Sequence, residues 1–240
     1  MRTSLISMLV ILSACSAPEV VVKGKVFASH DSTEPLAGAK ITIVDEQGGK
    51  YSDAKADSAG KFEAMAPEGE YIHAEISGGD GFETTSFTGL SGLSEVFRVE
   101  DGTLYGFSTA ERDALEVLFG GCPEFGTPGG VVFGEIRVLE LSQDGEHPVA
   151  SGIAEVVTRN QKTTWKACYL NEAEDAWDPA ASETGLGGRF AIFGIEPGTH
   201  ILTVGWEFAP DLWSYSDTYV RVIEDGVAPR FPAWVEWPEF

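Results

Sequence analysis

Residues 35–43 of the chain read PLAGAKITI, and two further stretches follow, ADSAGKF at 56–62 and APEGEY at 66–71. The segment at 35–38 predicts a turn, because proline and glycine favour the backbone angles that turns need. Ala39, Ile41 and Ile43 then alternate with polar residues, which places them on one face of a strand. Gly60 shortly before Phe62, and the turn at 67–69, predict two more strand boundaries. The pattern is typical of an all-β chain.

The same order of motifs returns about 110–130 residues further along the chain. It runs through VFGEI at 132–136, PVASGIAEV at 148–156, ETGLGGRF at 183–190 and IEPGTHIL at 195–202. A repeat of this length predicts tandem domains rather than a short-period solenoid. We expect a first β domain over residues 20–107 and a second over 130–240. The second has an insertion at 164–181 and an aromatic C-terminal tail.

These two copies together resemble the carboxypeptidase regulatory-like family, whose domains are transthyretin-like (prealbumin-like) β-sandwiches. The resemblance covers about residues 20–100 and 130–223, and the insertion in the second copy departs from it. It implies two tandem seven-stranded antiparallel β-sandwiches that have no active site of their own. Spacing by itself indicates only a β-sandwich.

One short helix is predicted between the copies, within the connecting segment 108–129. Ser108 and Glu111 have the spacing of a capping box. Leu115, Leu118 and Phe119 follow the i, i+3, i+4 pattern of an apolar helical face, and Gly120 is placed to end the helix. Residues 126–130, with their glycines and Pro128, then form a linker into the second copy.

The N-terminus, MRTSLISMLVILSAC, has the features of an export signal at residues 1–14. Arg2 supplies a positive start, and the apolar run is too short for the roughly 20 residues of a membrane-spanning helix. The ending at residues 12–15 resembles a bacterial lipobox, which implies lipidation (palmitate) at Cys15 and a membrane-anchored lipoprotein of the cell envelope. Ser16 favours the outer membrane, facing periplasm or exterior. An ordinary secretory peptide, cleaved near Ala17, is the alternative.

The tether between Cys15 and the first β run covers residues 15–19. Its four residues after the cysteine reach at most roughly 14 Å, so we expect the first domain to sit near the lipid headgroups. The chain carries 38 Asp and Glu against 16 Lys and Arg, a formal net charge of −22. That balance argues against a nucleic-acid partner, which needs clustered cations, and against an anionic lipid surface as a partner.

Two cysteines remain after Cys15, and export would place them in an oxidising compartment. We expect a disulfide between Cys122 and Cys168; two buried free thiols are the alternative. A bridge would close a loop of about 45 residues and contribute roughly 4 kcal/mol. No Cys-x-x-Cys or His-x-His pair is present, so we predict no metal site and no cofactor. Acidic groups around Asp53 and at 172–178 leave calcium as the alternative.

The chain is predicted not to be an enzyme, because the sequence contains none of the common nucleophile or metalloprotease motifs. The histidines lie far apart and occupy equivalent places in the two copies: His30 with His147, and His73 with His200. The repeat alone explains these positions, so they do not indicate a catalytic or metal site. The leading hypothesis is a structural or adhesive role, in which an acidic surface meets a protein or polysaccharide partner.

Aromatic residues crowd the last 35 positions of the chain. Trp206 and Tyr219 fit a sandwich core, whereas Trp213, Trp234 and Trp237 stand beside prolines and are candidate ligand-binding residues. Exposed tryptophans would stack on sugar rings, so the alternative function is that of a carbohydrate-binding module. If the tail instead folds back as an edge strand, these residues only cover the sandwich.

Overall fold

The computed structural model describes residues 18–90, 96–99, 103–140 and 145–235. We call residues 18–107 the N-terminal half and residues 130–235 the C-terminal half. The strands of the N-terminal half are β1 (Glu19–Phe27), β2 (Lys40–Asp45), β3 (Lys50–Lys55), β4 (Lys61–Pro67), β5 (Tyr71–Ser77), β6 (Phe82–Leu90), β7 (Val96–Arg98), β8 (Leu104–Tyr105) and β9 (Phe107–Ser108), the last of which reaches the helix.

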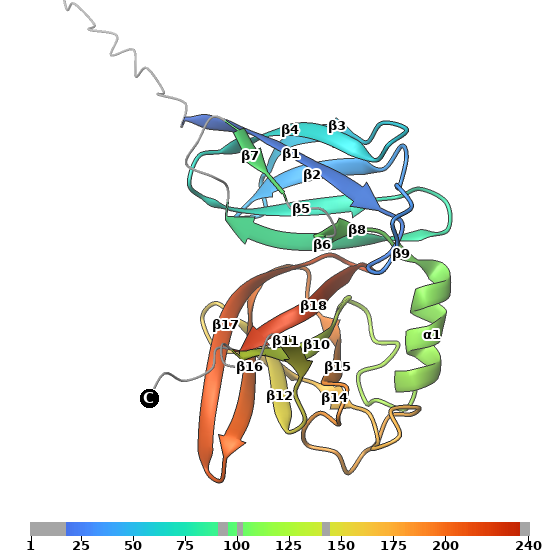
Figure 1. Ribbon diagram of the computed structural model, residues 1–240, viewed down its shortest axis with the longest axis vertical. Helices are drawn as coiled ribbons and strands as arrows, with labels where there is room; N and C mark the ends of the chain where they lie inside the picture. Colours follow the sequence, from blue (N-terminus) through green and yellow to red (C-terminus); the bar gives the residue numbers. More distant parts are fainter. Residues whose placement is uncertain (1–17, 91–95, 100–102, 141–144, 236–240) are drawn as a thin grey trace, which may run out of the picture.

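The helix α1 (Thr109–Phe119) connects the two halves (Figure 1). The strands after it are β10 (Gly130–Glu140), β11 (Gly145–Pro148), β12 (Gly152–Thr158), β13 (Thr164–Lys166), β14 (Cys168–Tyr169), β15 (Arg189–Ile195), β16 (Gly198–Ala209), β17 (Leu212–Val222) and β18 (Val227–Val235). The expected all-β class is therefore confirmed, and the helix lies where the capping box and the apolar stripe predict it.

The strand pairing of the two halves follows one pattern. In the N-terminal half, β1 lies between β4 and β7, while β3, β2, β5 and β6 pair in that order. In the C-terminal half, β10 lies between β15 and β18, while β13, β12, β16 and β17 pair in that order. The register also repeats, since Gly24 pairs with Phe62 and Gly134 pairs with Phe190. The motifs quoted from the sequence thus occupy equivalent positions.

The glycine that precedes the inward phenylalanine performs the same local task twice. Gly60 has a φ of 75° and Gly188 a φ of 69°, in the left-handed region that glycine enters without strain. A Cβ at either position would lie 2.5 Å from a backbone oxygen, that of Val26 or Ile136. The glycine carbonyls accept hydrogen bonds from the amides of these same two residues, at 2.9 and 2.8 Å. The glycine therefore lets the turn close against the first strand of its copy.

The turn at Gly38 gives a test of backbone strain. Gly38 has a φ of 77°, and the nearest atom to a Cβ built there is Lys55 Cε at 3.7 Å, so a side chain has room. We expect Gly38→Val to lower the free energy of unfolding by about 2 kcal/mol, because a β-branched residue is strained at positive φ. Gly38→Asn should cost less than about 1 kcal/mol, since asparagine tolerates this region. Urea unfolding of both variants is the measurement, and equal losses would contradict a backbone origin.

Three apolar clusters account for the core among the described residues. The first lies within the N-terminal half and contains the inward residues of β1, β2, β4 and β5. The second lies within the C-terminal half, around β10, β12, β15 and β16. The third joins the helix to both halves through Phe107, Leu115, Phe119 and Phe133. The helix thus packs its stripe where the two halves meet.

The sheets differ from the expectation of two sandwiches joined only by a helix and a linker. One sheet continues through both halves in the order β14-β15-β10-β18-β6-β5-β2-β3. The connection is a parallel pairing of Val227 in β18 with Thr85 in β6. Both strands would otherwise present an open edge at this point, and the pairing satisfies backbone groups there. The orientation of the halves is therefore fixed by the sheet as well as by the helix.

Candidate functional site

The junction between the halves is held by polar contacts from several elements. Arg221 in β17 donates from Nε to Glu75 Oε1 in β5 at 3.1 Å, and its own carbonyl accepts a hydrogen bond from Ser86 Oγ. Arg159 pairs with Glu46 across the same boundary. These residues lie far apart in sequence, and their pairing requires one fixed arrangement of the halves.

His73 lies in the middle of this junction and is fully buried. Its Nδ1 is 2.8 Å from Thr88 Oγ1 in the same half, and its Nε2 is 3.2 Å from Thr199 Oγ1 in the other half. Burial, with the charges of Arg221 and Arg230 nearby, lowers the pKa of His73 to about 4. The ring is thus neutral at physiological pH and hydrogen-bonds both halves.

Arg230 in β18 supports the same contact. It donates from Nη2 to Thr88 Oγ1 and to the carbonyl of Tyr219, each at 3.0 Å. Its Nε is buried and has no hydrogen-bond partner among the described residues. Burial lowers the pKa of Arg230 to about 10, and the guanidinium still carries its charge at neutral pH. The junction therefore holds a cation beside a neutral histidine, which keeps the histidine from being protonated.

The helix is tied to the C-terminal half at its far end. The expected capping box is present, with Ser108 and Glu111 each accepting from the other's backbone amide. After the helix, Cys122 is bonded to Cys168 of β14, with a Cα–Cα distance of 6.1 Å. This confirms the predicted disulfide. The insertion at 164–181 thus holds the end of the helix.

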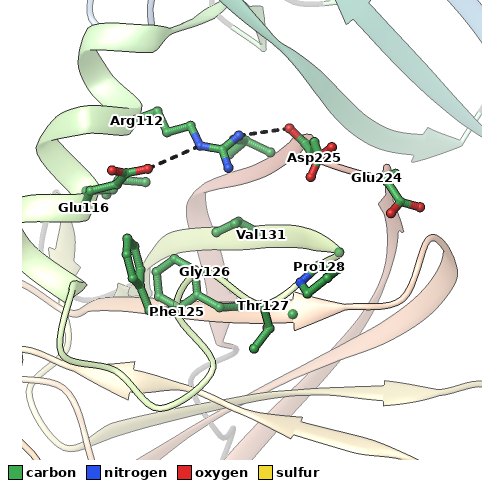
Figure 2. Close-up of a pocket in the computed structure, with 14 residues that line it drawn as sticks. Arg112, Glu116, Phe125, Gly126, Thr127, Pro128, Val131, Glu224 and Asp225 are labelled. Atoms are coloured by element: carbon green, nitrogen blue, oxygen red, sulfur yellow. Dashed lines mark hydrogen bonds and ion pairs between the residues drawn. The ribbon is translucent and has the colours of Figure 1, made fainter.

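A cleft of about 420 Å³ opens between the helix, the segment 125–131 and the turn before β18 (Figure 2). Its apolar floor consists of Leu115, Phe125, Val131, Phe193 and Val227. The rim carries Glu116, Glu224 and Asp225, together with Arg112.

Arg112 donates to Glu83 and to the carbonyl of Asp225, at 3.0 Å each, and lies 3.8 Å from Glu116. Figure 2 shows it spanning the cleft from the helix. Arg112 thus connects the helix to both halves of the junction. The remaining carboxylates and the apolar floor suit a contact with a side chain that is partly apolar and partly cationic. The predicted linker forms one wall of this cleft.

The sequence-predicted site residues do not come together in one place. Cys15 and Trp237 lie outside the described residues. Trp234 lies in β18, where its backbone pairs with that of Arg137 in β10, and nothing is described of its side chain. Trp213 is half-buried on β17 and stacks on Tyr215 with ring centroids 6.0 Å apart and an interplanar angle of 18°. Tyr215 is 57% exposed, so this pair forms a small aromatic surface that the sequence indicated only through Trp213.

Two of the acidic residues in the first group considered for calcium are held by other partners. Asp53 accepts from Thr42 and pairs with Lys50, which lowers its pKa. Asp57 accepts two backbone amides of its own turn. Among the described residues, no group of three or more histidine, cysteine or acidic side chains is arranged to hold a metal ion. No described helix is both long and apolar enough to span a membrane.

Comparison with known proteins does not assign the chain to a family. No family model matches it, and no curated protein does. Among solved structures, the Bacillus anthracis TIE protein is 13% identical with a TM-score of 0.31; the match covers 89% of this chain and 33% of that protein.

Two pilins give similar values. GBS52, the minor pilin of Streptococcus agalactiae, is 11% identical with a TM-score of 0.33 and coverages of 92% and 97%. The shaft pilin SpaA of Lactobacillus rhamnosus GG is 9% identical with a TM-score of 0.26 and coverages of 94% and 99%. Values this low establish neither a common fold nor a common function.

Proposed function

We propose that the protein is a non-enzymatic lipoprotein of the cell envelope, anchored through Cys15, with a structural or adhesive role. Its two halves would be seven-stranded β-sandwiches of the carboxypeptidase regulatory-like type, covering residues 20–107 and 130–240. The protein would act as a rigid spacer that presents its C-terminal half to a protein or polysaccharide partner. The observation that supports the spacer role is the junction, which holds the two halves in one arrangement.

Rigidity of this kind is not the default for neighbouring folded units, which usually move relative to one another unless a large interface holds them. Here a shared sheet, a capped helix and a disulfide act together with the ion pair of Arg221 and Glu75. The β16–β17 hairpin points away from the start of β1, at the opposite end of the longest axis (Figure 1). A lipid at Cys15 would therefore leave the hairpin at the far end from the membrane.

The anchor is tested by mass spectrometry of the mature N-terminus. We expect a peptide that begins at Cys15 and carries acyl chains, in the membrane fraction of cells that express the chain. Cys15→Ala should shift the protein out of that fraction, because two or three acyl chains provide stable anchoring. A mature chain that begins after Cys15 would exclude the lipoprotein.

The spacer role is tested by the distance between spin labels at exposed Ser58 and Glu172, one in each half. We expect a single narrow distance distribution. Arg112→Ala with Arg221→Ala should broaden it, whereas Lys50→Ala, which removes an ion pair within the N-terminal half, should not. A broad distribution in the unchanged protein would exclude a rigid spacer.

The aromatic pair of Trp213 and Tyr215 favours a second candidate, a carbohydrate-binding module. Its rings are nearly parallel, and Tyr215 is exposed, as stacking on a sugar ring requires. Titration with oligosaccharides should then change tryptophan fluorescence, and Trp213→Ala should abolish the change. No response across several glycans in the unchanged protein would exclude this candidate.

A further inference from the structure

The outer face of the β4-β1-β7 sheet gathers cations in an otherwise acidic protein. A cleft of about 700 Å³ lies on this face, and five of the 16 lysines and arginines of the chain line it: Lys23, Lys25, Lys55, Lys61 and Arg98. Only two carboxylates, those of Asp57 and Glu63, line it with them. The described lining therefore has a net charge of about +3, opposite in sign to the net charge of −22 of the chain. We call it the basic face.

Strand alternation places these side chains on the surface. Val22 and Val26 of β1 point into the core and are 2% and 0% exposed, so Lys23 and Lys25 between them point outward. On β4, Phe62 is buried, and its neighbours Lys61 and Glu63 point outward in the same way. The basic face is thus a product of the register and not of flexible loops.

Two pairs of like charges stand opposite each other on this face. Lys25 of β1 pairs in register with Lys61 of β4, and Lys23 pairs with Arg98 of β7. Like charges directly opposite on neighbouring strands destabilise a sheet. Lys23 has a compensating ion pair with Glu63 at 2.7 Å, whereas Lys25 has a cation–π contact, with Nζ 5.3 Å from the ring centre of Phe27.

The C-terminal half shows the arrangement that stability alone would favour. Glu135 pairs in register with Arg189 there, at the position equivalent to Lys25 and Lys61. The same site of the repeat therefore carries opposite charges in one copy and like charges in the other. A local rule broken at one or two positions is typical of functional sites in natural proteins, and clustered cations call for an anionic ligand.

We propose that the basic face docks on the anionic headgroups of membrane phospholipids. The proposal rests on the anchor at Cys15, because β1 begins four residues after it and belongs to this sheet. In Figure 1, β4 and the start of β1 lie at the top of the view, in the part of the N-terminal half that is farthest from the C-terminal half. The acidic remainder is repelled by an anionic membrane, so the basic face turns toward the headgroups. The net charge of the chain argues against an anionic membrane as a partner. The uneven distribution of that charge nevertheless leaves one face basic.

Lipid and basic residues together form the two signals that stable membrane attachment uses. Each lysine or arginine near an anionic surface contributes about a fivefold gain in affinity. Docking of the basic face would also favour one orientation of the molecule on the membrane. The acyl chains would hold the protein on the membrane, and the basic face would orient it.

The experiment uses the full chain as purified from membranes and reconstituted into vesicles. One set contains phosphatidylcholine alone, and the other contains about a third phosphatidylglycerol. Acetylation rates of individual lysines are read by mass spectrometry. We expect Lys25 and Lys61 to react at least about threefold more slowly on the anionic vesicles, while Lys40, which lies outside the basic face, reacts equally on both. High salt should remove the protection, because the contact is electrostatic.

Lys25→Glu separates docking from folding. The substitution places opposite charges at the register pair shared with Lys61, as Glu135 and Arg189 do in the C-terminal half. The protein should therefore unfold no more easily than the unchanged chain. Protection of Lys61 on anionic vesicles should nevertheless be lost. Lys40→Glu changes the net charge equally, outside the basic face, and should leave that protection in place.

Equal rates on the two vesicles would overturn the proposal, as would protection that Lys25→Glu leaves unchanged. Protection by soluble polyglutamate but not by the anionic vesicles would overturn it in favour of an acidic polymer. The mass of the N-terminal peptide in the same digest reports the anchor separately. A chain without acyl groups that still shows the protection would refute the lipoprotein and retain the basic face.

Discussion

Loss of the Cys122–Cys168 bond will lower the free energy of unfolding by about 4 kcal/mol. The bond joins residues separated by 46 positions, and closing a loop of that length constrains the unfolded chain by this amount in the chain-entropy model. Cys122 and Cys168 are both buried in the third core cluster, which also contains Phe119 and Phe133. The loss should therefore act first on the helix and on the insertion that it contacts.

Urea unfolding with and without dithiothreitol measures this effect. The matched control is the double variant Cys122→Ala, Cys168→Ala, whose stability dithiothreitol should not change. Hydrogen exchange should become faster in α1 and β14 and remain slow in β2 and β5, since the first core cluster contains no part of the bond. A loss of less than about 1 kcal/mol, or equal acceleration in both halves, would contradict this account.

Local features of the fold could be predicted because their causes are local. The turn at Gly38, the strand boundary at Gly60 and the capping box of Ser108 with Glu111 each depend on residues a few positions apart. The repeat followed for the same reason, since equivalent glycines and phenylalanines occupy equivalent registers in the two copies. The disulfide required one more premise, an oxidising compartment, which the N-terminal signal supplied.

The junction could not be predicted, because its contacts depend on how the halves are oriented. The pairing of Val227 with Thr85 joins two edge strands, and each edge alone is compatible with solvent. Arg221 and Glu75 lie 146 positions apart, and nothing in their surroundings in sequence links them. Repetition explains the position of His73 in the sequence, but its burial between the halves follows only from their arrangement.

The basic face could not be predicted from the sequence for a similar reason. A net charge of −22 describes the whole chain and argues against an anionic partner. The basic face appears only when register brings Lys25 opposite Lys61 and Lys23 beside Arg98. Composition therefore gives the net charge of the protein, and it could not show that one sheet face reverses the sign.

His73 will make the protein lose about 3 kcal/mol of stability between pH 7 and pH 4, relative to the variant His73→Gln. The folded-state pKa of about 4 lies below the value near 6.5 of an unfolded histidine. Below pH 6.5 the unfolded chain therefore binds a proton that the folded chain excludes, so stability falls as the pH falls and levels off near pH 4. Burial and the charges of Arg221 and Arg230 lower the pKa, and Asp45 opposes them only partly.

Urea unfolding from pH 7.5 to pH 4 for both proteins gives the difference. Glutamine retains hydrogen-bonding groups toward Thr88 and Thr199 but does not titrate. The pH dependence of the variant's stability therefore comes from the carboxylates and from His200, whose pKa burial also lowers. Subtracting that curve leaves the contribution of His73. The ring signals of His73 in an NMR titration should stay those of neutral imidazole down to about pH 5. Parallel stability curves, or a ring that titrates near pH 6.5, would show that the junction opens readily to water, and the rigid spacer would then lose its structural basis.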